Sequence, residues 1–249
     1  MTRWIVLLFS LLIISCASKD PRTLGSPRLP PQGGSPNIFK RYVIEEDAKM
    51  MVGWSQNFDM SGVSFNEKMT LSLVTRRHVV MASHYRRKPG SKVVFHNRLG
   101  KRVERTLISV LGVAEDIAVG LLDYDVPRDI KVYALPTAQE DFGHLKGASV
   151  VITDQNRRIF FHEINRIGPT SIGFRHPKVP KHGWGKKLVK GDSGNPSFLI
   201  SGDELVLVET HTFGGAGSGP FYGSSMIQEK LSAAIAKLSP GYSLRFKSL

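Results

Sequence analysis

Residues 191–196 read Gly-Asp-Ser-Gly-Asn-Pro and place Ser193 between two glycines, just before an apolar stretch. Glycine on both sides lets the backbone turn tightly and bring N–H groups close to a ligand. This arrangement suits a serine that attacks a carbonyl group, and such a serine also needs a base and a group that orients the base. Eight histidines are available as the base. A plain β-turn, in which all these residue types are common, is the alternative interpretation.

Two further segments resemble the trypsin-like serine proteases, the family with the chymotrypsin fold. Residues 73–85 (LVTRRHVVMASHY) resemble the strand, turn and second strand that lead into the family's Ala-Ala-His-Cys. The resemblance puts His84 in the place of the general base, and Tyr85 where animal enzymes carry a disulfide cysteine. Residues 115–122 (EDIAVGLL) resemble the family's Asp-Ile-Ala-Leu-Leu strand, whose aspartate is here Asp116. The order His84, Asp116, Ser193 along the chain is that of the chymotrypsin fold and not of subtilisin or the α/β-hydrolases.

The resemblance covers roughly residues 65–230 and implies an all-β fold of two antiparallel six-stranded β-barrels with the active site between them. It implies that Ser193 attacks a peptide carbonyl while His84 accepts its proton and Asp116 fixes the imidazole. The N–H groups of Gly191 and Ser193 would bind the developing oxyanion. The expected activity is therefore that of a serine endopeptidase, which acts on a polypeptide and uses no cofactor and no metal.

The family's specificity pocket has its base about six residues before the serine, which gives Lys187 here. Trypsin-like enzymes place an aspartate there, whereas residues 175–190 of this chain contain six basic residues and no acidic one. The pocket wall resembles the His-Trp-Gly-Gly wall of bacterial glutamyl endopeptidases, in which the histidine contacts the substrate carboxylate. We therefore predict cleavage after Glu or Asp. The alternative is that the wall histidine is an ordinary strand residue and the lysines are a solvated loop. The predicted wall residues are His211, Thr212, Phe213 and Gly214.

Two departures from the family pattern concern the serine loop. Asn195 replaces the second glycine of the family's Gly-Asp-Ser-Gly-Gly-Pro. Trypsin-like zymogens mature when a new N-terminal amine pairs with the aspartate before the serine, here Asp192. No clear activation sequence is visible, so either another cation holds Asp192 or a later cut is needed.

The elements that must position these residues are short apolar runs bounded by turn residues, a pattern typical of β-strands. A different pattern covers residues 224–238 (SSMIQEKLSAAIAKL), where apolar residues recur at helical spacing and Pro240 and Gly241 end the run. We expect a C-terminal amphipathic helix packed on the sheet, with Met226, Ile227, Leu231, Ala234, Ile235 and Leu238 on its apolar face. The expected strands lie within residues 69–74, 93–95, 103–113, 117–122, 148–152, 159–167, 171–174, 197–200 and 204–211.

The first 38 residues have the pattern of an export signal followed by a spacer. Residues 4–15 (WIVLLFSLLIIS) are apolar, follow Arg3, and are too few for a comfortable membrane span. The sequence Ile-Ile-Ser-Cys that ends at Cys16 resembles the bacterial lipobox, in which the cysteine is lipidated. We expect a signal peptide at 1–15, a lipid-anchored Pro/Gly-rich linker at 16–38, and an exported protein held on a bacterial membrane. An ordinary signal peptide with an incidental cysteine is the alternative.

The remaining residues, 39–249, are expected to form the protease domain, with one barrel at 39–140 and the second barrel and the helix at 141–249. The 249 residues carry 34 Lys plus Arg against 21 Asp plus Glu, a net charge of +13. This charge favours anionic partners without choosing among them. A single cysteine excludes a disulfide scaffold and a Cys-rich zinc site. The sequence leaves the oligomeric state open.

Other motifs do not amount to a site. The glycines at 214–219 lack the Lys and Ser/Thr of a phosphate loop, and His162 has no partner histidine at metal-binding spacing. The basic residues between 86 and 102 come without a stacking-aromatic motif, so we expect no specific nucleic-acid partner. Two other function classes remain open: a protease-fold lipoprotein that binds peptide or anionic ligands without turnover, and a basic surface protein that binds an anionic polymer.

Overall fold

The computed structural model describes residues 34–139, 141–177 and 185–249. The expected signal peptide, Cys16 and most of the linker lie outside these residues and stay predictions. No helix within the described ranges is long and apolar enough to cross a membrane.

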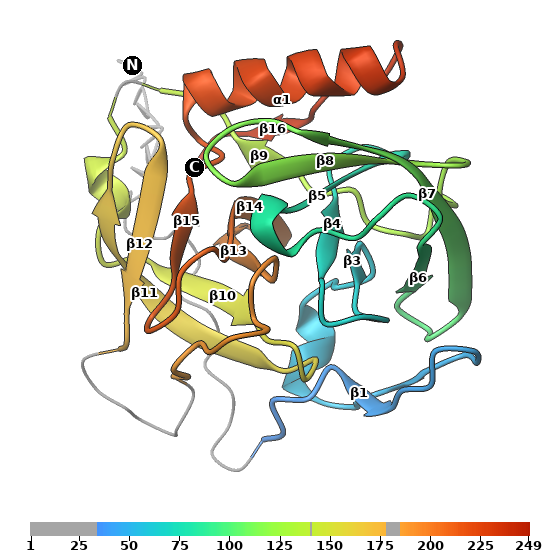
Figure 1. The fold of residues 1–249 in the computed structure, drawn as a ribbon. Helices are drawn as coiled ribbons and strands as arrows, with labels where there is room; N and C mark the ends of the chain where they lie inside the picture. The colour runs from blue at the N-terminus through green and yellow to red at the C-terminus, as the bar shows by residue number, and fades with distance from the viewer. Residues whose placement is uncertain (1–33, 140, 178–184) are drawn as a thin grey trace, which may run out of the picture.

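The first half of the chain forms a six-stranded antiparallel sheet in the order β3-β4-β5-β8-β7-β6 (Figure 1). All six residues of β8 are buried, as expected of a run of aliphatic residues that packs on both faces. The end strands β3 and β6 contact each other, which closes the sheet into a barrel. The strands are β3 (Val63–Ser64), β4 (Leu71–Leu73), β5 (His78–Ala82), β6 (Lys92–His96), β7 (Arg102–Gly112) and β8 (Ile117–Leu122).

The second half forms another six-stranded antiparallel sheet, in the order β14-β13-β10-β11-β12-β15. Its end strands β14 and β15 also contact each other, so this sheet closes in the same way. The strands are β10 (Ser149–Thr153), β11 (Ile159–Ile167), β12 (Ser171–Arg175), β13 (Pro196–Ser201), β14 (Glu204–Thr210) and β15 (Ser218–Pro220). The predicted fold class is thereby confirmed: two six-stranded antiparallel barrel-like sheets and one C-terminal helix.

Shorter elements surround the two barrels. One antiparallel pair joins β1 (Phe39–Arg41) to β2 (Lys49–Met50), and one parallel pair joins β9 (Leu135–Pro136) to β16 (Phe246–Lys247). The 3-10 helices are η1 (Trp54–Asn57), η2 (Ser83–Tyr85) and η3 (Gly143–Leu145). Of these, η2 matters most for the site, because it directly follows β5.

The helix α1 (Ser225–Leu238) lies along the top of the molecule in Figure 1 and contacts β7 and β8 of the first barrel. Its side chains Ile227, Leu231 and Ile235 join a core cluster that contains residues of both barrels. One expected core residue is wrong: Met226, in the first turn, is 47% exposed because it lies on the outer side of the helix start. The helix therefore ties the C-terminus to the first barrel.

The same cluster includes a direct aromatic contact between the segment that links the barrels and the second barrel. Tyr133 and Phe198 are fully buried, and their ring centroids lie 4.6 Å apart. The Tyr133 hydroxyl donates a hydrogen bond to the Asp59 carbonyl, 2.9 Å away, so this ring contacts both halves of the fold.

We predict that Phe198→Ala lowers the free energy of unfolding by about 3–5 kcal/mol, because it removes a fully buried ring and leaves a cavity. Chemical denaturation measures this change. Leu99→Ala is the control, since Leu99 is 89% exposed and its loss should stay within about 0.5 kcal/mol. Equal losses in the two variants would contradict the assigned core.

Candidate active site

The pairing of β5 with β8 brings His84 and Asp116 together. Ala82, the last residue of β5, pairs with Ile117, the first residue of β8. His84 lies two residues beyond one strand and Asp116 one residue before the other, at the same edge of the sheet. The Nδ1 atom of His84 lies 2.5 Å from Asp116 Oδ2, and the His84 backbone N–H donates to Asp116 Oδ1 at 2.8 Å. Asp116 thus holds both the ring and the backbone of the histidine.

A tight turn orients the Asp116 carboxylate toward His84. Glu115 and Asp116 have φ values of +50° and +66°, in the left-handed region that non-glycine residues seldom adopt. Two backbone hydrogen bonds fix this turn: Ile117 N–H to Ala114 O at 2.9 Å, and Ser83 N–H to Asp116 O at 2.7 Å. Strained backbone of this kind persists where the surroundings over-determine it, and it clusters at functional sites.

Ser193 reaches the histidine from the second barrel. Its Oγ lies 2.9 Å from His84 Nε2, on the opposite side of the ring from Asp116. The His84 side chain is 47% exposed, so a ligand can approach it from solvent. Three residues from distant parts of the chain therefore form one hydrogen-bonded relay from carboxylate through imidazole to hydroxyl, the geometry that nucleophilic acyl transfer needs.

Gly194 lets the serine loop approach the first barrel. Its φ is +84°, and a Cβ atom there would lie 2.7 Å from the carbonyl oxygen of Thr70. Its N–H donates to the His211 carbonyl at 2.9 Å, which fastens the loop to the end of β14. A larger residue would push Ser193 away from His84.

Asn195, the departure from the family pattern, is fully buried behind the nucleophile. Its side-chain amide donates to the Asp192 carbonyl at 3.0 Å, and its Oδ1 accepts from Thr153 Oγ1 at 3.1 Å. The amide therefore braces the backbone of the serine loop against β10, a contact that a glycine lacks.

The expected oxyanion donors have no acceptor among the described residues. Neither the N–H of Gly191 nor that of Ser193 makes a hydrogen bond to the part of the protein that the structure describes. Gly191 has φ +98°, and a Cβ there would lie 2.6 Å from Gln155 Oε1. The positive φ favours glycine at this position, and neither amide has an acceptor within the described residues.

Asp192 is 1% exposed and its carboxylate is held by several donors. Burial alone would raise the pKa of Asp192, but the backbone N–H groups of Val189 and Gln155 and the Lys186 ammonium outweigh burial and lower it. Asp192 is therefore a buried anion directly before Ser193.

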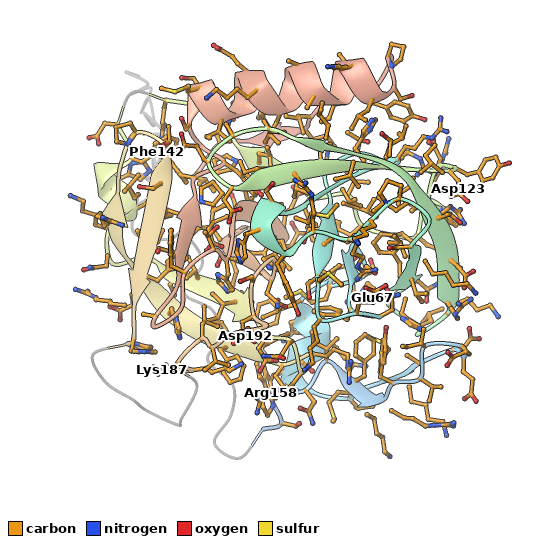
Figure 2. All side chains as sticks on the ribbon, viewed as in Figure 1. Glu67, Asp123, Phe142, Arg158, Lys187 and Asp192 are labelled. Carbon is orange, nitrogen blue, oxygen red and sulfur yellow. The ribbon has the colours of Figure 1, made fainter. Side chains whose placement is uncertain are left out.

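The predicted pocket residues separate into an exposed group and a buried one. Lys187 and Phe213 are exposed, and Figure 2 shows Lys187 at the periphery near the lower end of β12. His211 is 1% exposed, and its Nδ1 lies 2.8 Å from Oε1 of the fully buried Glu209. The Nε2 of His211, the second carboxylate oxygen of Glu209 and the Thr212 hydroxyl are buried without a hydrogen-bond partner among the described residues.

The segments between these two groups are closely packed. Leu188 and Gly215 exchange two backbone hydrogen bonds, of 2.7 and 3.2 Å, and join the two expected walls. A Cβ on Gly217 would lie 2.8 Å from Leu188 Cδ1 and 3.5 Å from His211 Nδ1. A separate open groove of about 200 Å³ has Asp116, Thr212 and Phe213 in its lining.

His162, set aside as a metal ligand on sequence grounds, joins the pocket wall to the lysine loop. Its Nδ1 lies 2.6 Å from the Ala216 carbonyl, and its Nε2 accepts the Lys186 backbone N–H at 3.1 Å. Only a neutral ring with its proton on Nδ1 satisfies both contacts. Burial lowers the pKa of His162 to about 4, and this keeps the ring neutral at neutral pH.

Sequence reasoning did not assign roles to Lys186, Gln155 and Glu209, which contact Asp192 or His211 directly. Lys186 stood in the sequence as one of six basic residues in the loop, and Gln155 and Glu209 carried no motif. Among the described ranges, no group of three or more His, Cys, Asp or Glu side chains could hold a metal ion.

No model of a known protein family matches the chain. No curated protein sequence matches it either. Among solved structures, human heparin binding protein is similar: the two chains are 15% identical, the match covers 70% of this chain and 88% of that one, and the TM-score is 0.53. At this identity the likeness concerns the fold alone. With the two six-stranded sheets, it shows that the chain has the chymotrypsin fold.

We predict that the free energy of unfolding falls as the pH is lowered from about 6.5 to about 4, and that His162 is one cause. In this range the unfolded chain binds a proton at His162 that the folded chain does not, so stability rises with pH. The contribution is on the order of 3 kcal/mol, at about 1.4 kcal/mol per pKa unit. His162→Gln, which keeps one donor and one acceptor, should flatten the pH dependence measured by urea denaturation.

The control is His144→Gln, because His144 is exposed. An unchanged pH slope in His162→Gln, or an equal change in His144→Gln, would overturn the assignment of a buried neutral His162.

Proposed function

We propose that this protein is a serine endopeptidase. The observation that carries the proposal is the relay from Asp116 through His84 to Ser193, with contacts of 2.5 and 2.9 Å across two barrels. In the proposed reaction Ser193 Oγ attacks the carbonyl carbon of a peptide bond while His84 Nε2 takes its proton. Asp116 keeps the imidazole proton on Nδ1 and stabilises the imidazolium. His84 then gives its proton to the leaving amine, and water repeats the sequence to release the acyl group.

The backbone N–H groups of Gly191 and Ser193 would bind the negative oxygen of the tetrahedral intermediate. Their lack of a protein acceptor within the described residues supports this role. One such donor contributes about 3–4 kcal/mol to the transition state, because it is aimed in advance at the charge that develops.

We propose further that the pocket favours an acidic side chain before the cleaved bond, the P1 position. The Oε1 atom of Glu209 lies 2.8 Å from His211 Nδ1 and orients the ring. In the proposed complex the Nε2–H of His211 would donate to a P1 carboxylate, which would satisfy an atom that has no other partner among the described residues. The close packing of Gly217 against Leu188 and His211 argues against large P1 side chains.

A second candidate function is binding of an anionic polymer without turnover. A groove of about 550 Å³ has four cationic side chains in its lining: Arg76, Arg128, Lys131 and Arg245. The net charge of +13 favours such a ligand, and the structurally similar human protein is by its name a heparin binding protein. This function would not need Ser193, which makes the two candidates separable.

We predict that a fluorophosphonate probe labels Ser193 covalently and that Ser193→Ala abolishes the labelling. His84→Ala should lower the labelling rate and the peptidase rate at least about 10⁴-fold, because it removes the base. Labelled peptides identified by mass spectrometry locate the modified serine. The control is Ser91→Ala, far from the relay. The second candidate function would be favoured by a folded wild type that neither reacts with the probe nor cleaves peptides. Such a wild type and Ser193→Ala should then bind heparin equally well.

We predict that peptides with Glu or Asp at P1 have a higher kcat/KM than matched peptides with Gln or Asn. His211→Ala should reduce this preference about tenfold or more, since it removes the Nε2–H donor that would contact a P1 carboxylate. A P1-scanning peptide library measures both. Preference for Arg or for large apolar P1 residues would refute the acidic pocket while leaving the peptidase proposal intact.

A further inference from the structure

The carboxylate before the nucleophile is completely hydrogen-bonded. Asp192 Oδ1 accepts from the backbone N–H and the side-chain amide of Gln155, at 3.1 and 3.2 Å. Asp192 Oδ2 accepts from the Val189 N–H at 2.8 Å and from Lys186 Nζ at 3.0 Å. A carboxylate has about four lone-pair sites, and these four donors fill them.

The cation among these donors comes from the chain itself. Lys186 Nζ lies between Asp192 Oδ2 and Asp154 Oδ2, at 3.0 and 2.7 Å, and its side chain is only 15% exposed. Arg158 contacts Asp154 as well, at 2.7 Å. Two buried carboxylates are thus matched by two cations, and the cluster is neutral overall.

This arrangement bears on how the oxyanion site forms. In the trypsin-like enzymes that the sequence resembles, a new N-terminal amine pairs with this aspartate after a cut in the chain. Here Lys186 supplies the charge and the hydrogen bond that such an amine would supply. A buried carboxylate that has lost its cation is strongly unfavourable and turns toward water if its loop can move.

We propose that Lys186 is a positioning residue that holds residues 191–193 in the oxyanion-binding conformation, so that the chain becomes active without a cut at the start of the protease domain. The inference rests on the proposed peptidase function. Lys186 contacts no reacting atom. It acts through Asp192, whose carbonyl group shares a peptide unit with the Ser193 N–H. The neutral His162 holds the Lys186 backbone and so helps to keep this loop in place.

The test compares Lys186→Met with Lys190→Met in the full chain, expressed in bacteria and purified in detergent. Lys190 is exposed, lies in the same loop, and its side chain has no ion pair within the described residues, so both variants lose one positive charge. Lys186→Met should lower kcat about 10²–10³-fold with KM nearly unchanged, since the loss falls on the transition state. Lys190→Met should keep wild-type kcat, and Lys186→Arg should restore most of it.

Two further measurements distinguish a failure of the peptidase proposal from a failure of the proposed role of Lys186. Hydrogen–deuterium exchange should rise in residues 189–194 of Lys186→Met and stay unchanged in β5 and β8, whether or not the protein turns over peptides. The intact mass of probe-labelled wild type should show a chain that was not cut near residue 39, the expected start of the protease domain. A wild type without labelling would refute the peptidase.

If the wild type is active, either of two results would refute the proposed role of Lys186 and leave the peptidase proposal standing. One is an unchanged kcat and unchanged exchange in Lys186→Met. The other is labelling confined to a form with a new N-terminus close to the start of the domain.

Discussion

The serine loop depends on the neutralisation of negative charge inside the second barrel. Moving a carboxylate out of water costs several kcal/mol unless it is paired and hydrogen-bonded, and both Asp154 and Asp192 are essentially unexposed. Lys186 lies between the two, and the donors on Asp192 come from the β10–β11 turn, from Lys186 and from Val189. One buried ion therefore fixes three segments relative to each other. In many extracellular proteins disulfides hold such segments together. This chain has a single cysteine, and here ion pairs hold the segments instead.

The contact between His84 and Ser193 joins two barrels, so its geometry is only as good as the packing between them. Gly194 allows the loop to lie against Thr70 of the first barrel, and Tyr133 and Phe198 fill the space behind. The helix α1 adds a tie, because Gln228 donates to the carbonyls of Pro136 and Tyr222 while the helix packs on β7 and β8. Close packing resists small shifts, and a displacement of about 1 Å between reacting groups can cost 10²-fold in rate.

Local patterns predicted the long strands, because apolar runs are properties of contiguous residues, whereas the pairing of His84 with Asp116 was implied by the resemblance to trypsin-like proteases. The runs at 117–122 and 159–167 match β8 and β11 residue for residue. Strands β3 and β15 have only two and three residues, too few for an alternating or apolar pattern to be recognised in the sequence. The cationic partner of Asp192 could not be predicted from the sequence either, because which lysine of a basic loop points inward depends on the path of the backbone. Lys186 points inward to Asp192, while its neighbour Lys187 is exposed, so one position separates an internal cation from a surface one.

The distribution of charge around the site connects loop architecture with substrate choice. Inside the second barrel the buried acids contact basic side chains: Asp154 and Asp192 share Lys186, Arg158 also contacts Asp154, and Glu209 contacts His211. The cluster around Lys186 is thus neutral overall, and the net charge of +13 comes from basic residues elsewhere in the chain. Such a net charge raises the local concentration of acidic peptides and speeds their encounter. In the proposed acidic pocket, a P1 carboxylate would meet Nε2 of His211, one of the buried polar atoms that have no hydrogen-bond partner among the described residues.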